Sequence, residues 1–184
     1  MKILTLIINL LFLSFSMGCA MVHTYSDYYG KVIDTETKEP LEGAAVLAVY
    51  YTKQPGPGGE VTHYADAQET LTDKNGEFKI PSNTVTTFRP LQYFDSYAYF
   101  TIFKPEYGCY PYHKVVKPMF VPNGTLPKNQ YVIIELPRLK TRAERIDSTH
   151  CSPDSYIPYL KAKKFIDLIN RENKSLGLGI EKYE

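Results

Sequence analysis

Proline and glycine divide much of this chain into short apolar runs, which favours short strands over long helices. The 184 residues include 13 prolines, 11 glycines and 16 tyrosines. Apolar residues make up 43% of the sequence, which is enough to build a packed core. The sequence therefore predicts an all-β domain of ordinary size with extensions at its ends.

Several short segments have the composition of strands, and their connections carry turn signals. Strands are expected at 28–33, 44–51, 70–72, 77–80, 96–104 and 130–136. Asp73-Lys74-Asn75-Gly76 predicts a hairpin, because Asp opens turns and Gly accepts the left-handed conformation that closes them. The Pro-Gly-rich segment 55–59 predicts a loop joining two strands.

The segment 96–104 has apolar or aromatic side chains on both faces, which predicts a central strand covered on each side. Prolines then interrupt residues 105–128 repeatedly. A long irregular connection of this kind is usually functional or held by a crosslink.

Two motifs resemble the turns and core positions of carboxypeptidase regulatory-like domains. They are Gly30-x-Val32-x-Asp34-x-x-Thr37-x-x-Pro40-Leu41-x-Gly43-Ala44-x-Val46 and Thr70-x-Thr72-Asp73-x-x-Gly76-x-Phe78-x-Ile80. The resemblance covers residues 28–137 and implies a seven-stranded antiparallel β-sandwich of the transthyretin (prealbumin) type. It also implies an accessory or adhesion-like module, and none of the motif residues is a catalytic group.

The C-terminal extension, residues 138–184, has a different pattern. Apolar residues recur at helical spacing between residues 157 and 169, which predicts an amphipathic helix over 158–173. We expect it to pack against the sandwich. The alternative is a basic helix that lies on a membrane or a partner.

The N-terminus has the layout of an export signal, with Met1-Lys2 followed by a short apolar run. Ser16-Met17-Gly18-Cys19 resembles the lipobox of bacterial lipoproteins. The resemblance implies a signal peptide over 1–18, a lipid on Cys19 and a tether over 19–27. Ala20 after the cysteine favours the outer membrane, so we expect a lipid-anchored protein of the cell envelope, facing the periplasm or the surface.

Two alternatives to acylation are ordinary cleavage after Ala20 and a membrane-spanning N-terminal helix. The apolar run is shorter than the roughly 20 residues that a spanning helix needs.

With Cys19 acylated, Cys109 and Cys151 remain as a pair in an oxidising compartment, where a disulfide is expected. Closing this loop would stabilise the fold by roughly 4 kcal/mol in the chain-entropy model. The alternative is two separate buried thiols.

The sequence shows no complete catalytic or metal-binding set. His63, His113 and His150 lack the neighbouring Glu of a zinc peptidase, and no phosphate-binding glycine loop is present. We therefore expect no metal, no cofactor and no enzymatic activity. A cysteine nucleophile assisted by His113 or His150 is the alternative.

The net charge of +1 gives no reason to expect nucleic acid as a partner. The tyrosines of the irregular connection, Tyr107, Tyr110 and Tyr112, are candidates for binding sugar or peptide, although tyrosines more often cap a core. We expect a non-catalytic envelope lipoprotein that binds an envelope protein. A polysaccharide-binding module and a small hydrolase are the alternatives.

Overall fold

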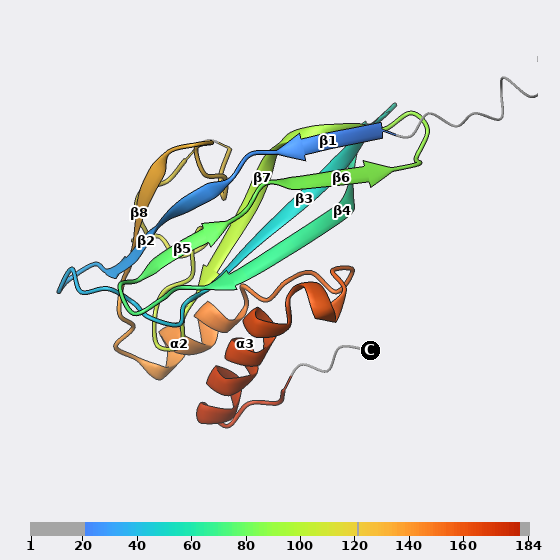
Figure 1. Cartoon of the computed structure of the whole chain (residues 1–184). Coiled ribbons are helices and arrows are strands. Elements are labelled where there is room, and N and C mark those ends of the chain that lie inside the picture. Colours follow the sequence, from blue (N-terminus) through green and yellow to red (C-terminus); the bar gives the residue numbers. More distant parts are fainter. Residues whose placement is uncertain (1–20, 121, 181–184) are drawn as a thin grey trace, which may run out of the picture.

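The computed structural model describes residues 21–120 and 122–180 and consists mainly of strands (Figure 1). The strands are β1 (Met21–Tyr25), β2 (Tyr28–Asp34), β3 (Ala45–Gly56), β4 (Gly59–Leu71), β5 (Glu77–Ile80), β6 (Asn83–Thr87), β7 (Tyr93–Phe103) and β8 (Tyr131–Leu136). Three helical segments come after them, α2 (Arg142–Thr149), the 3-10 turn η1 (Tyr159–Lys161) and α3 (Lys163–Ser175). The predicted signal peptide and Cys19 lie outside the described residues. Within them, no helix is long and apolar enough to span a membrane.

Two three-stranded sheets pack against each other. Their strand orders are β5-β2-β8 and β4-β3-β7, and β1 pairs with β6 in a separate two-stranded ribbon. The core between the sheets contains Val32, Phe78 and Ile134 from the first sheet and Val46 and Phe100 from the second. The predicted mainly-β fold with packed sheets is confirmed.

The second sheet is also covered on its outer face, by α3 (Figure 1). Leu47 and Val49 of β3 and Phe103 of β7 are buried there against Phe165 and Ile169 of the helix. β3 is therefore buried on both faces over its first six residues, which accounts for its continuous apolar run. Because the apolar face of α3 is buried, the structure agrees with packing on the sheet and not with a membrane-bound helix.

The predicted hairpin around residues 73–76 is wrong, because the turn connects the two sheets. β4 pairs with β3, whereas β5 pairs with β2. The turn chemistry itself is as expected, since the Asp73 carboxylate accepts backbone N–H bonds from Asn75 and Glu77 at 2.8 and 2.9 Å. Gly76 has φ +75°. Local turn residues determine where the chain reverses direction. They do not determine which strand the next strand will pair with.

Strand pairing departs from the expected antiparallel sandwich in two places. β2 and β8 run parallel, with Gly30 opposite Val132. β7 is an edge strand and not a central one. Its outer edge is covered by the irregular connection, which exchanges backbone hydrogen bonds between Ile102 and Tyr110 at 3.1 and 3.0 Å.

Two segments predicted as irregular form strands instead. Residues 21–25 of the expected tether 19–27 are β1, because Tyr25 is buried and its hydroxyl donates to the Asp95 carbonyl at 2.9 Å. In the predicted loop 55–59 the ladder continues to the pair Gly56 and Gly59, although the segment does join two strands.

The predicted helix 158–173 is divided. A 3-10 turn precedes α3, and Ala162 between them has φ −135°, outside the helical region. The start of α3 is fixed by Glu69 of β4, whose carboxylate accepts two backbone N–H bonds from the first turn at 2.9 and 3.0 Å. Leu160, placed on the apolar face by the sequence pattern, is instead 82% exposed.

The helix α2 is not among the elements expected from the sequence. It begins at a capping box, in which Thr141 and Glu144 each accept a backbone N–H bond from the other residue. The spacing Thr-x-x-Glu is the signal that could have revealed it.

The close approach of β2 to β8 generates a stability prediction. A Cβ at Gly30 would lie 2.2 Å from the Val132 carbonyl oxygen, which is far inside a van der Waals contact. We expect Gly30→Ala to destabilise the fold by about 2 kcal/mol in urea denaturation, because the parallel strands must separate. Gly58→Ala, where a Cβ meets nothing within 4 Å, is the matched control. Equal midpoints for the two variants would contradict the close approach.

Candidate functional site

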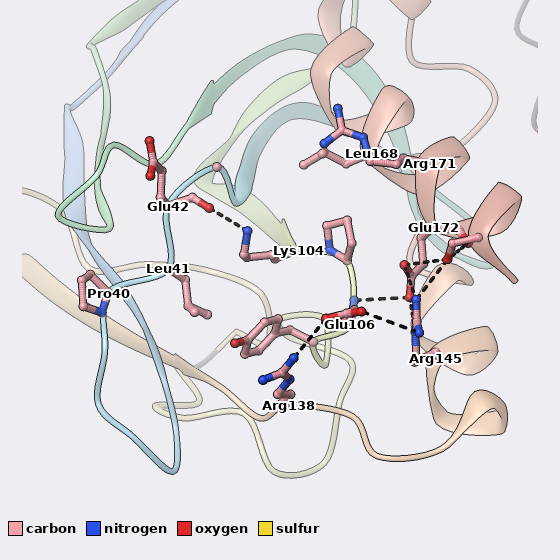
Figure 2. A pocket seen from close by; sticks show the side chains of 14 residues that line it. Pro40, Leu41, Glu42, Lys104, Glu106, Arg138, Arg145, Leu168, Arg171 and Glu172 are labelled. Carbon is pink, nitrogen blue, oxygen red and sulfur yellow. Dashed lines mark hydrogen bonds and ion pairs between the residues drawn. The ribbon is translucent and has the colours of Figure 1, made fainter.

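A cleft of about 720 Å³ lies between the loops at one end of the sheets and α3 (Figure 2). The loop after β2 and the segment after β7 form one side of it, and α2 and α3 form the other. The charged residues that line it are Glu42, Lys104, Glu106, Arg138, Arg145, Arg171 and Glu172. The cleft therefore contains four cationic and three anionic side chains, and their pairing decides what it can bind.

The anionic side of the cleft is built around Glu172, whose side chain is 3% exposed. Its carboxylate accepts two hydrogen bonds from the Arg145 guanidinium, at 2.7 and 2.9 Å, and one from the Glu106 backbone N–H at 3.2 Å. Hydrogen bonding to Glu172 raises the pKa of Arg145 above its usual value. This cluster joins α2, α3 and the segment after β7, and Glu172 has its partners within the fold.

Lys104 and Arg171 are the two cationic side chains of the cleft that take part in neither the Arg145–Glu172 nor the Arg138–Glu106 ion pair. Lys104 donates to the Glu42 backbone carbonyl at 2.7 Å, and in the described residues neither cation forms an ion pair with a carboxylate. Burial lowers the pKa of Lys104, the Glu42 carboxylate partly offsets this, and Arg171 lowers it further. Lys104 is half-buried, and Arg171 lies opposite it on α3 (Figure 2). Two such donors suit a carboxylate or phosphate group.

The three tyrosines expected to bind a ligand do not share a surface. Tyr107 is half-buried at the cleft and hydrogen-bonds to Asp34. Tyr110 is fully buried, and its hydroxyl donates to the Thr125 carbonyl at 2.8 Å, so it belongs to the core and cannot be part of an exposed platform. Tyr112 is 69% exposed and lines a different cavity.

That second cavity, of about 160 Å³, lies on the outer face of the β4-β3-β7 sheet. Tyr51 and Tyr99 line it together with Tyr112, and the first two rings meet edge to face at 5.6 Å between centroids. Asn123 and Asp154 add polar groups at its wall. Aromatic rings beside amide and carboxylate groups suit a sugar.

The structure pairs Cys109 with Cys151 across 42 residues of chain, with 6.6 Å between their Cα atoms. The disulfide joins the irregular connection to the segment after α2. His113 and His150 line a cavity of about 260 Å³ beside it, so the histidines and cysteines of the hydrolase alternative do lie together. A bonded sulfur is no nucleophile, so that chemistry would need the reduced pair. Within residues 21–120 and 122–180, no three His, Cys, Asp or Glu side chains gather as metal ligands.

No protein-family model matches the chain, and neither a curated protein nor a solved structure matches it. Its function must therefore be inferred from the sequence signals and from the geometry of the cleft and the cavities.

The sequence patterns did not reveal the cleft, although one signal was present. Glu172 lies seven residues after Phe165, on the face of α3 that carries the buried apolar residues. A carboxylate in that position needs a cationic partner, because an unpaired buried charge is very unfavourable.

We predict that losing one partner of the buried Arg145–Glu172 ion pair lowers the free energy of unfolding more than losing both partners. Arg145→Met leaves the Glu172 carboxylate buried without its main partner, which should cost about 3 kcal/mol in urea denaturation. The double variant with Glu172→Met should recover much of that loss. Lys163→Met, which removes a surface ion pair with Asp167, is the control and should change stability by less than about 1 kcal/mol. A double variant no more stable than the single one would contradict the prediction.

Proposed function

We propose that this protein is a non-catalytic lipoprotein of the bacterial cell envelope that uses its β-sheet domain as a binding module. The anchor is a lipid on Cys19, supported by Gly18-Cys19 at the end of an export signal. Several acyl chains together hold a protein firmly on a membrane without a spanning helix. Ala20 supports the outer membrane as the destination.

We also propose that the domain is a transthyretin-type sandwich of the carboxypeptidase regulatory-like kind. The glycines of the two motifs occupy positions that such motifs require: Gly43 and Gly76 have positive φ, and Gly30 lies at the close contact with β8. The apolar motif positions, among them Leu41 and Val46, are buried. These features support the assignment of residues 28–137 to an accessory module.

The observation that supports binding is the pair of cations, Lys104 and Arg171, in a cleft where Glu106 and Glu172 are paired with Arg138 and Arg145. An envelope partner with an exposed carboxylate or phosphate would supply the missing charge. The chain as a whole is nearly neutral, so this attraction is local to the cleft.

A second candidate function is binding of a neutral polysaccharide in the tyrosine-lined cavity. It is favoured by the cluster of Tyr51, Tyr99 and Tyr112 beside Asn123. In this case the cleft would serve only to hold α2 and α3 on the sheets.

The lipid anchor predicts a modified N-terminal peptide. Mass spectrometry of the protein from host membranes should find Cys19 as the first residue, with acyl chains attached. Cys19→Ser should move the protein from the membrane to the soluble fraction, because the acylated atom is lost. An unmodified peptide that starts at Met21 would refute anchoring.

The cleft predicts binding to an acidic polymer. In affinity electrophoresis the protein should be retarded by polygalacturonate and not by neutral dextran, and Lys104→Ala should weaken retardation about tenfold, as expected for loss of one charged hydrogen bond. Binding should weaken as pH rises through the lowered pKa of Lys104, because the ammonium group loses its charge. Lys104→Arg should keep binding at high pH.

Two controls decide between the candidate sites. Lys164→Ala removes the same charge from α3 outside the cleft and should leave polygalacturonate binding unchanged. Tyr112→Ala should also have no effect on it. Retardation by dextran that Tyr112→Ala abolishes would instead support the tyrosine-lined cavity.

A further inference from the structure

The N-terminal end of β1 lies beside an exposed loop. Met21 pairs with Thr87, the last residue of β6, so the loop after β6 begins at the point where the described chain begins (Figure 1). Cys19 precedes Met21 by two positions, and two residues of extended chain span at most about 7 Å. A lipid on Cys19 would therefore hold the loop 88–91 close to the membrane surface.

This loop exposes large apolar side chains. Phe88 is 74% exposed and Leu91 is 83% exposed. Val22 of β1, which pairs with Thr86 of β6, is 60% exposed, and Val61 in the β3–β4 hairpin is 53% exposed. Figure 1 shows this loop, the hairpin and the start of β1 at the same end of the molecule. An apolar cluster at one tip is a feature of interaction surfaces.

The backbone conformation of Leu91 is energetically unfavourable. Its φ of +64° lies in the left-handed region, which is unfavourable for leucine by about 1 kcal/mol and would be easier for Gly or Asn. With its side chain in solvent, no packing within the described chain offsets this cost. The exposed side chain is therefore better explained by a contact outside the folded domain.

Arg89 lies between these two apolar residues. Its guanidinium donates to the Tyr64 backbone carbonyl at 3.0 Å and forms no ion pair with a carboxylate of the described residues. A cation flanked by apolar side chains has the arrangement that membrane interfaces favour, with the charge near lipid phosphates and the apolar groups below them.

We propose that the loop 88–91 is a second membrane contact, in which Phe88 and Leu91 enter the bilayer interface and Arg89 meets lipid phosphates. This inference rests on the lipid anchor of the proposed function. Together the two contacts fix the orientation of the domain, because a single point of attachment would leave the domain free to rotate about it.

The test uses the absence of tryptophan from the chain, so that one substitution introduces one fluorophore. The full-length acylated protein with Phe88→Trp is reconstituted into vesicles of phosphatidylethanolamine and phosphatidylglycerol with brominated acyl chains. Most of the emission should be lost relative to unbrominated vesicles, because interfacial groups reach about 5–10 Å into the bilayer. The matched control is Leu71→Trp, a 42% exposed position at the end of β4, roughly 23 Å of strand beyond Tyr64, whose carbonyl Arg89 contacts. Its emission should be unchanged.

Three results would overturn the inference. Equal quenching of the two variants, in protein whose N-terminal peptide carries acyl chains, would leave the anchor intact and remove the loop contact. An unquenched Phe88→Trp variant whose emission shifts to the blue with protein concentration would assign the tip to a second copy of the chain. A peptide without acyl chains, by contrast, would refute the anchor and with it this proposal.

Discussion

Burial of β3 on both of its faces is the constraint on which the rest of the structure depends. One face of this strand meets the β5-β2-β8 sheet, and the other would be a broad apolar surface in water without α3. At roughly 25 cal/mol per Å², covering such a surface is among the largest contributions available to a domain of this size. The C-terminal segment is thus part of the core and not an appendage, which is why the disulfide, the Glu69 cap and the Arg145–Glu172 pair all act to position it.

The cleft is a result of that arrangement. α3 lies across one sheet, and the loops at the end of the sheets cannot pack flat against it, so a space remains whose walls are long charged side chains. Glu172 pairs with Arg145 at the wall of this space, whereas the Lys104 ammonium donates to a backbone carbonyl. Because the charged walls are needed to hold α2 and α3 together, a binding site here shares residues with the scaffold. Loss of binding and loss of stability must therefore be separated by substitutions such as Lys104→Ala, which leave the central ion pair intact.

Sequence patterns predicted the local features well, since these depend on near neighbours. Phe78 and Ile80 are buried while Glu77 and Lys79 are exposed, as their alternation indicates. The sequence patterns failed where a residue distant in the chain determines the local structure. Glu69 sets the start of α3 from nearly one hundred residues away, and the pairing of β5 with β2 depends on both sheets. Tyr110 has the sequence context of a loop tyrosine because it lies in the proline-rich segment 105–128, yet its side chain is buried in the core. The disulfide between Cys109 and Cys151, in contrast, was predicted from the number of cysteines and the expected oxidising compartment alone.

The irregular connection between β7 and β8 has a consequence for how copies of this protein coexist. An uncovered edge strand offers a row of free N–H and C=O groups, which is a template for the strand of another molecule. Here the edge of β7 is occupied by its own chain, through hydrogen bonds with Gly124 and Tyr110. Proteins confined side by side on a surface meet each other far more often than proteins in free solution. A chain that closes its own sheet edge can therefore be crowded without aggregating through that edge.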